Sequence, residues 1–246
     1  MSAFTNTQLT EASGYNPNNM VFSTPSSEQI KDKDGNVSIS YKRINIGTKN
    51  PDGTKGELVI QTPDVFSFGV KRNTLDSSRV SYTLPLALWN KDGVTTQEKE
   101  FTDVFSAICD NCKEHILENK DEIEKYDLES SDLKKFNPLW WKRDKGKIVD
   151  GSGPVLYVKL NTDRDGNVTS SMYDSATGED ITPLTLENKY CYVTAALKIE
   201  SIFIGNKVSL QVKVYEAYMR PLNTGFKKLL RPPVEGKVNV SQSSSV

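Results

Sequence analysis

The chain has 246 residues, a formal net charge of −1, 36% hydrophobic residues and 26% charged residues. A chain of this length can bury a substantial core without disulfide bridges or structural metal, which argues against a wholly disordered protein. The near-zero net charge argues against a protein that coats polyanions through bulk charge alone.

The charge is divided into zones along the chain. Residues 98–135 contain 12 acidic and 6 basic side chains, a net of −6, so the rest of the chain carries −1 − (−6) = +5. Residues 138–160 contain five basic and two acidic side chains, a net of +3. Any anion-binding surface is therefore expected outside the acidic segment.

Three features predict a protein that is neither secreted nor inserted in a membrane. The three cysteines, Cys109, Cys112 and Cys191, are too few for a disulfide scaffold. The first ten residues lack the charged and apolar regions of a signal peptide. The sequence also has no apolar run of the roughly 20 residues that a membrane helix requires.

In chain order, residues 1–30 are rich in Ser, Thr, Asn and Pro, and they predict a disordered N-terminal segment. Alternating apolar residues at 37–46 and 57–62 predict two strands joined as a hairpin. Further strands are expected at 65–72 and 81–90, where Pro85 indicates an edge position or a bulge because proline offers no N–H group.

One helix is expected next. Thr95 and Glu98 form a capping-box pattern, after which apolar residues recur at helical spacing. The charged stretch at 118–136 predicts a shorter helix and a connector, with Ser130 or Ser131 capping one more turn.

Strand patterns resume after this segment. Residues 155–162 and 168–174 flank a turn signal at 163–167, which predicts a hairpin, and residues 191–204 and 208–219 flank a tighter turn at 205–207. Taken together, these expected elements predict a mainly β fold, with a β-barrel or OB-like core, extra strands and one inserted helical segment. We expect one such domain over residues 31–220, with its helical insert at about 95–135, and a flexible tail at 221–246 that is first basic and then rich in serine.

The stretch between the acidic segment and the next strand combines aromatic and cationic side chains. Four cations follow Trp140 and Trp141 within six residues. Burying the whole segment would therefore place unpaired charges in the core. Flat rings beside Lys and Arg suit single-stranded nucleic acid, because bases stack on the rings while the cations contact phosphates. The alternative is the ordinary start of a strand with one buried Trp and a solvated charge run. The four cations are Lys142, Arg143, Lys145 and Lys147.

Two later strands repeat the pairing of an aromatic ring with a cation. Alternation places Tyr157 and Lys159 on the non-core face of one strand, and Lys213 and Tyr215 on that of another. Phe66 and Phe68 share a face too, but they fit core positions equally well. On extended chain, Trp140 and Trp141 point to opposite sides, so one is expected to anchor the core while the other meets a ligand.

Other chemistry is poorly supported. Cys109, Cys112 and His115 could join Cys191 as zinc ligands, but their helical spacing places them on the apolar stripe, which favours core residues. The single histidine and the lack of nucleophile-elbow, phosphate-loop or metalloprotease motifs indicate a protein that is not an enzyme. No cofactor and no metal are predicted.

Four blocks carry a family resemblance: SYTLPLALWNKDG, FTDVFSAICDNCKEHIL, PLWWKRDKGKIVDGSGPVLYVKL and IESIFIGNKVSLQVKVYEAYM. Together they resemble a family of single-stranded DNA-binding proteins with an OB-like fold from nucleocytoplasmic large DNA viruses, over about residues 65–219. The resemblance implies a sequence-tolerant DNA-binding protein that supports viral replication or recombination, with single-stranded DNA and other replication proteins as partners, in a cytoplasmic viral factory or the nucleus. The alternative is a virion or replication-scaffold protein whose exposed aromatics contact other proteins.

Overall fold

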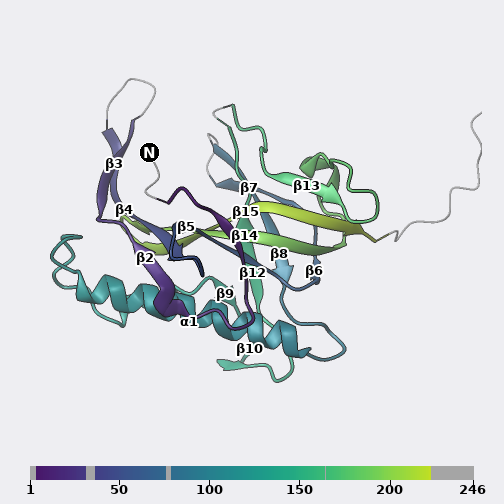
Figure 1. The fold of residues 1–246 in the computed structure, drawn as a ribbon, viewed down its shortest axis with the longest axis horizontal. Coiled ribbons are helices and arrows are strands. Elements are labelled where there is room, and N and C mark those ends of the chain that lie inside the picture. Colours follow the sequence, from purple (N-terminus) through teal and green to yellow (C-terminus); the bar gives the residue numbers. More distant parts are fainter. Residues whose placement is uncertain (1–3, 32–36, 76–78, 164, 223–246) are drawn as a thin grey trace, which may run out of the picture.

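The computed structural model describes residues 4–31, 37–75, 79–163 and 165–222, and every structural statement below concerns these residues (Figure 1). The expected tail at 221–246 therefore lies almost wholly outside the described part of the chain.

The described residues contain one long helix, α1 (Thr96–Glu118), and three short 3-10 helices, η1 (Pro17–Asn19), η2 (Asp132–Lys135) and η3 (Pro183–Leu186). The strands before α1 are β1 (Gln8–Glu11), β2 (Met20–Phe22), β3 (Ser26–Lys31), β4 (Val37–Lys49), β5 (Lys55–Gln61), β6 (Val65–Ser67), β7 (Lys71–Leu75) and β8 (Arg79–Ala87). Those after it are β9 (Leu139–Trp140), β10 (Arg143–Asp144), β11 (Lys147–Ile148), β12 (Val155–Lys159), β13 (Ser171–Asp174), β14 (Cys191–Ile204) and β15 (Val208–Pro221).

Five strands close into a barrel. Hydrogen bonding runs from β6 to β8, β12, β15 and β14, and β14 pairs with β6 again to complete the ring. If the five barrel strands are numbered in chain order (β6, β8, β12, β14, β15), their order around the barrel is 1-2-3-5-4. The third and fifth of them, β12 and β15, are parallel where Lys159 pairs with Lys213. The predicted mainly β fold with a barrel core and one inserted helix is confirmed, although α1 enters between the second and third barrel strands.

Alternation along each barrel strand decides which side chains enter the core. On β12, Leu156 and Val158 are fully buried inside the barrel, whereas Tyr157 and Lys159 point outward. The same period buries Leu210, Val212 and Val214 on β15. The residues that the sequence places on outer faces therefore do lie on the outside.

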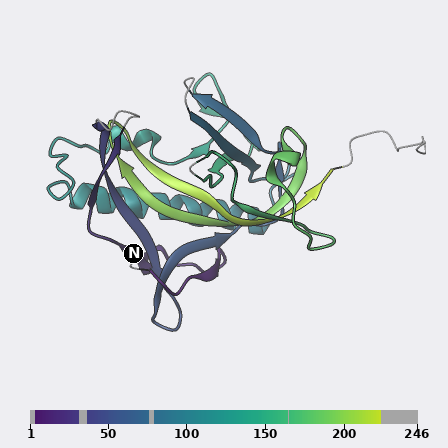
Figure 2. The same ribbon diagram turned by 90° about the horizontal axis from the view of Figure 1, so that it is seen from above.

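The two longest strands extend the barrel into a larger sheet. β14 pairs with β15 over nearly its full length, as the tight turn at 205–207 predicts. Its other edge pairs with β6, then β5, then β4, and register shifts beside Ala196 and Ile199 let the strand bend between these partners. Figure 2 shows this hairpin, in green to yellow, running along the molecule with α1 beyond it.

Helix α1 begins at the predicted capping box, in which the Thr95 hydroxyl accepts from the Glu98 backbone and the Glu98 carboxylate accepts from the Thr95 backbone. Its apolar stripe joins the common core through fully buried side chains, among them Phe101, Phe105 and Ile108. The shorter helix expected in the charged stretch at 118–136 is wrong: residues 119–131 form turns and loop, and only the 3-10 helix η2 follows. Ser131 precedes the short helix η2 but makes no side-chain capping bond.

The expectation of a disordered segment at 1–30 is wrong for residues 4–30. β1 pairs in parallel with β5, and the Asn50 amide donates to the Asn6 carbonyl at 2.8 Å. Phe4 is buried. Polar segments with few apolar side chains can still be ordered by backbone pairing with an existing sheet edge, which composition does not report.

The predicted hairpin of residues 155–174 is also wrong. The Asp163 N–H donates to the Asn167 carbonyl and Thr162 forms an isolated bridge with Val168, but β13 pairs in parallel with β15 instead of β12. The expected strand at 65–72 is split at Gly69 into β6 and β7. This split explains Pro85: its strand has neighbours on both sides, but Pro85 faces the gap between β6 and β7, where no N–H group is needed.

Candidate nucleic-acid interface

The two adjacent tryptophans point to opposite sides, as predicted. Trp140 pairs with Val155 at the start of β12 and is 56% exposed. The Trp141 ring packs edge-on against Trp89 with 5.3 Å between centroids, and the Trp89 indole N–H donates to Thr102 on α1. Trp141 is thus the core-side anchor, and Trp140 is available to a ligand.

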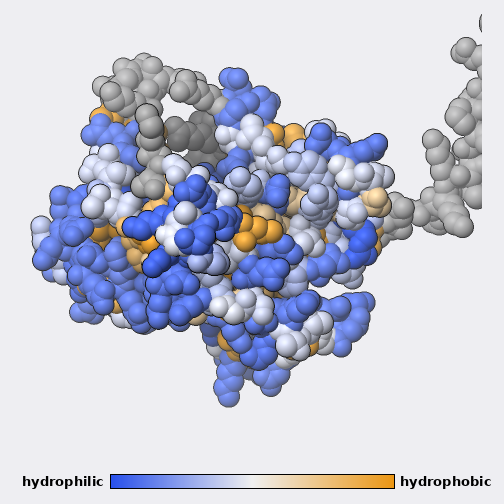
Figure 3. Space-filling view, viewed as in Figure 1, coloured by the Kyte–Doolittle hydropathy of each residue, from blue (hydrophilic) through white to orange (hydrophobic). Residues whose placement is uncertain are grey.

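The cations after the tryptophans lie on a short hairpin of β10 and β11. The turn residues Lys145 and Gly146 both have positive φ, and the Arg143 guanidinium donates to the Gly146 carbonyl at 3.0 Å. The hairpin projects beside α1 at the lower edge of Figure 1, and its tip is hydrophilic in Figure 3. All four predicted cations are exposed: Lys142, Arg143, Lys145 and Lys147.

Four other predicted residues line the outside of the barrel along β12 and β15. Tyr157 and Lys159 share the outward side of β12, and Lys213 and Tyr215 share the outward side of β15; buried residues lie between them on each strand. The parallel register sets Lys159 directly beside Lys213. Trp140 shares this side, because its partner Val155 points the same way as Tyr157. We call these five residues the outer face: Trp140, Tyr157, Lys159, Lys213 and Tyr215.

The two lysines of the outer face differ in their partners. The Lys159 ammonium donates to the Gln211 amide oxygen at 2.7 Å, whereas Lys213 forms an ion pair of 2.8 Å with Glu200, which Arg43 also contacts. Burial lowers the pKa of Lys159, the charge of Lys213 lowers it further, and Glu200 offsets part of the shift. An anion placed between the two lysines would relieve their repulsion.

The aromatic residues Phe66 and Phe68 do not fit the alternative of core burial. Phe68 is 36% exposed and Phe66 is half-buried, because Val65 and Ser67 take the inward positions of β6. Tyr190 and Tyr192 lie beside them, and the sequence did not single out either tyrosine. The signal that could have found Tyr192 is the alternation of β14, whose neighbours Cys191 and Val193 are fully buried.

The three cysteines are buried in the core, and His115 is half-buried beside it. Cys109, Cys112 and Cys191 are fully buried, and burial raises the pKa of Cys112 to about 12. The His115 ring stacks on Phe22 with 3.9 Å between centroids, which confirms its assignment to the packed side of α1. Within the described ranges, no group of three or more His, Cys, Asp and Glu side chains could hold a metal ion.

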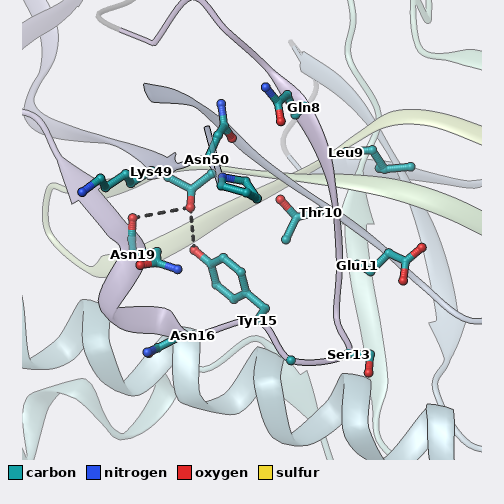
Figure 4. A pocket seen from close by; sticks show the side chains of 13 residues that line it. Gln8, Leu9, Thr10, Glu11, Ser13, Tyr15, Asn16, Asn19, Lys49 and Asn50 are labelled. Atoms are coloured by element: carbon teal, nitrogen blue, oxygen red, sulfur yellow. Dashed lines mark hydrogen bonds between the residues drawn. The ribbon is translucent and has the colours of Figure 1, made fainter. Parts of the chain in front are cut away.

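A polar pocket of about 550 Å³ lies apart from the outer face (Figure 4). It is formed by β1, the loop that follows it, and the end of β4. Amide and hydroxyl side chains dominate its wall, and the hydroxyls of Tyr15 and Thr48 are 3.1 Å apart. The sequence predicted none of these residues, because their hydroxyls and amides match no catalytic or metal-binding motif.

No helix among the described residues is long and apolar enough to span a membrane.

Comparison with known proteins identifies relatives in viruses. The chain is 28% identical over 181 residues to the "Early 31 kDa protein" of Frog virus 3, covering 72% of this chain and 69% of the relative. It is 29% identical over 185 residues to the "Uncharacterized protein 007R" of Invertebrate iridescent virus 3, covering 73% of this chain but 38% of that relative. A viral family is what the sequence blocks predicted. A family model described as "Protein of unknown function (DUF2738)" matches residues 14–245, and the chain therefore belongs to this family.

Proposed function

We propose that this chain is a non-enzymatic, sequence-tolerant single-stranded DNA-binding protein that supports viral replication or recombination in a cytoplasmic viral factory or the nucleus. The observation that carries the proposal is the outer face, where Trp140 and Tyr157 are 56% and 51% exposed next to two adjacent lysines. Exposed rings of this size are costly to leave in water, and bases are ligands that stack on them.

The position of these residues in the barrel supports the same function. In OB folds, oligonucleotides bind across the face of the second and third strands. The corresponding strands in this barrel are β8 and β12, and β12 carries Tyr157 and Lys159 while β9 beside it adds Trp140. The rings and the nearest cations therefore lie where an OB-like barrel presents its ligand surface.

The β10–β11 hairpin adds a second kind of contact. Its four cations are exposed and follow the Trp140–Trp141 pair in the chain. Because these side chains already lie in solvent, they can reach phosphates without opening the core. Since the net charge of the chain is only −1, attraction has to come from this local surface and is expected to weaken steeply with salt.

A role in viral replication or recombination is part of this proposal, and the name of the Frog virus 3 relative says only that it is an early protein. Other replication proteins are then expected as partners on the same strand.

Titration of oligo-dT against tryptophan fluorescence at several salt concentrations tests the proposal. We expect quenching at low salt, and Trp140→Ala to weaken binding by about 5- to 150-fold, which is 1–3 kcal/mol per stacked base. Trp140→Phe is expected to keep most of the affinity with less quenching, because it retains a flat ring.

The matched control is Tyr126→Ala, since Tyr126 is 66% exposed but lies in the acidic segment after α1. An unmodified protein that neither quenches nor shifts oligo-dT at low salt would refute the proposal.

The rival function is a virion or replication-scaffold protein that uses the exposed aromatics for protein contacts. The ion pairs of Glu200 with Lys213 and Arg43 favour it, because they neutralise part of the outer face. This function predicts capture of a protein partner that is insensitive to salt, and no shift of labelled single strands in a gel.

A further inference from the structure

A second group of exposed rings lies on the same barrel, around β6 and the start of β14. The Phe66 ring is the hub: its centroid is 5.2 Å from that of Phe68, 5.5 Å from Tyr190 and 6.0 Å from Tyr192. We call Phe66, Phe68, Tyr190 and Tyr192 the aromatic cluster. These contacts are edge-to-face or tilted, so where a ring face is covered within the cluster it is covered by a neighbour's edge and not by a parallel ring.

The cluster is open to solvent. Tyr190 is 49% exposed and Phe68 is 36% exposed, while Phe66 and Tyr192 are half-buried beneath them. A contiguous group of exposed aromatic rings marks a binding surface more often than chance packing.

The register of the sheet connects the cluster to the outer face. Tyr192 pairs with Phe66, Phe66 with Ala87, Ala87 with Val155, and Val155 with Trp140. Directly opposed residues point to the same side of a sheet, so these five side chains form one row across the outside of the barrel. Three strand spacings separate Phe66 from Trp140, about 14 Å along the sheet.

The side chains in the middle of this row project less from the sheet than the rings at its two ends. Ala87 and Val155 are small and half-buried, and they lie between large rings at either end. An extended chain that crosses the strands could therefore contact Trp140 at one end of the row and the aromatic cluster at the other.

The cluster is held in place by backbone contacts. The Val70 N–H donates to the Leu186 carbonyl, and the Asn188 N–H donates to the Val70 carbonyl, both at 3.1 Å. Gly69 has φ +76°, and a Cβ there would lie 2.3 Å from the Lys189 carbonyl oxygen. The two segments that supply the rings are thus fixed to each other before any ligand arrives, which reduces the entropy lost on binding.

Cations flank the cluster as they do the outer face. The Arg220 guanidinium lies 4.5 Å from the Tyr192 centroid and also pairs with Asp64, and the Lys71 ammonium donates to Asn188 at 2.8 Å. Lys189 is exposed next to Tyr190. An apolar peptide would gain little from these charges, whereas a nucleic acid strand uses rings and cations together.

We infer that the aromatic cluster is a second base-stacking site of the same interface, so that a bound single strand crosses the barrel from Trp140 past Ala87 to Phe68 and Tyr190. This inference rests on the proposed function. It adds the path of the strand and predicts that affinity depends on strand length.

The test compares oligo-dT of about 6 and about 16 nucleotides, a range that spans the site sizes of OB folds. A double variant, Phe68→Ala with Tyr190→Ala, should bind the short strand like the unmodified protein, because the short strand is held at Trp140 and the cations beside it. It should bind the long strand at least about fivefold more weakly, the loss expected for one stacked base. Trp140→Ala should weaken both.

A second variant, Phe68→Leu with Tyr190→Leu, keeps apolar side chains but removes the flat rings, and it should show the same loss for the long strand. Because Phe68 and Tyr190 are only 36% and 49% exposed, a modest loss of unfolding free energy is expected, and binding is compared where unfolding curves show both variants to be folded.

If the unmodified protein binds both strands and the two double variants bind the long strand with unchanged affinity, the inference is overturned while the proposed function stands. The inference is likewise overturned if alanine weakens binding and leucine restores it, since the cluster would then be an apolar docking surface. If the unmodified protein binds neither strand, the proposed function itself has failed.

Discussion

The outer face of the barrel and the β10–β11 hairpin both present cations, but they do so in two different ways. On the outer face, Lys213 is paired with Glu200 and Lys159 is hydrogen-bonded to Gln211, so the cations are held in fixed positions beside exposed rings. On the hairpin, the cations are exposed and belong to a two-stranded element that is attached to the core at Trp141.

This difference separates two contributions to binding. Rings and lysines held on a rigid sheet favour short-range contacts with bases and with individual phosphates. Exposed cations on a projecting hairpin act mainly through longer-range attraction, which salt screens. Three experiments test whether the two regions divide the work in this way.

The largest effect is expected from Trp141→Ala, which removes the ring that attaches the hairpin to Trp89. Truncating a buried Trp costs about 3–5 kcal/mol, and because Trp141 is only half-buried we expect about 2–3 kcal/mol of unfolding free energy. Trp140→Ala should change stability by no more than about 0.5 kcal/mol, as for other surface substitutions. Urea unfolding of the two variants measures both values, and equal losses would contradict the assignment of the two rings to opposite sides.

A smaller effect is expected from Lys142→Ala combined with Arg143→Ala on the hairpin. If each side chain contacts one phosphate, the slope of log affinity against log salt should flatten by about 1.4, at about 0.7 per contact. Affinity at low salt should fall by about tenfold and at high salt hardly at all.

The control for this pair is Lys99→Ala combined with Lys113→Ala, which removes two cations of α1 that pair with Asp103 and Asp110. Its slope should equal that of the unmodified protein. A hairpin variant that loses affinity equally at all salt concentrations would show that these side chains contribute through packing contacts and not through their charge.

The smallest effect is expected from pH, acting through Lys159. Its pKa in the free protein is lowered by burial and by Lys213, and a bound phosphate would raise it again. Affinity should therefore be highest while Lys159 is protonated in the free protein, and should fall by a few-fold as pH rises through that lowered pKa. Lys159→Arg keeps its charge over this range and should remove this part of the pH dependence.

Binding titrations from neutral pH up to the ordinary lysine pKa of about 10.4 measure the effect. Identical pH profiles for the unmodified protein and Lys159→Arg would mean that Lys159 does not contact a phosphate.

Several features of the fold could be predicted because they depend on local chemistry. The capping box at Thr95 and Glu98 marks the helix start with its own hydrogen bonds. Alternation along β12 and β15 assigns Tyr157, Lys159 and Lys213 to the outside, since apolar neighbours on each strand take the inside.

The features that could not be predicted depend on partners far away in the chain. Composition predicted disorder before residue 31, but β1 is ordered by pairing with β5. Phe66 and Phe68 fit a core pattern, and only the inward position of Ser67 in the barrel places them outside.

Residue order and periodicity are enough to establish a strand-rich fold with one inserted helix, and to place the adjacent tryptophans on opposite sides of the chain. Which tryptophan lies on which side depends on the folded molecule, because Trp141 finds Trp89 and α1 on its side of β9 whereas Trp140 meets solvent. Periodicity reports that two sides exist, but the core lies on the side where distant elements pack.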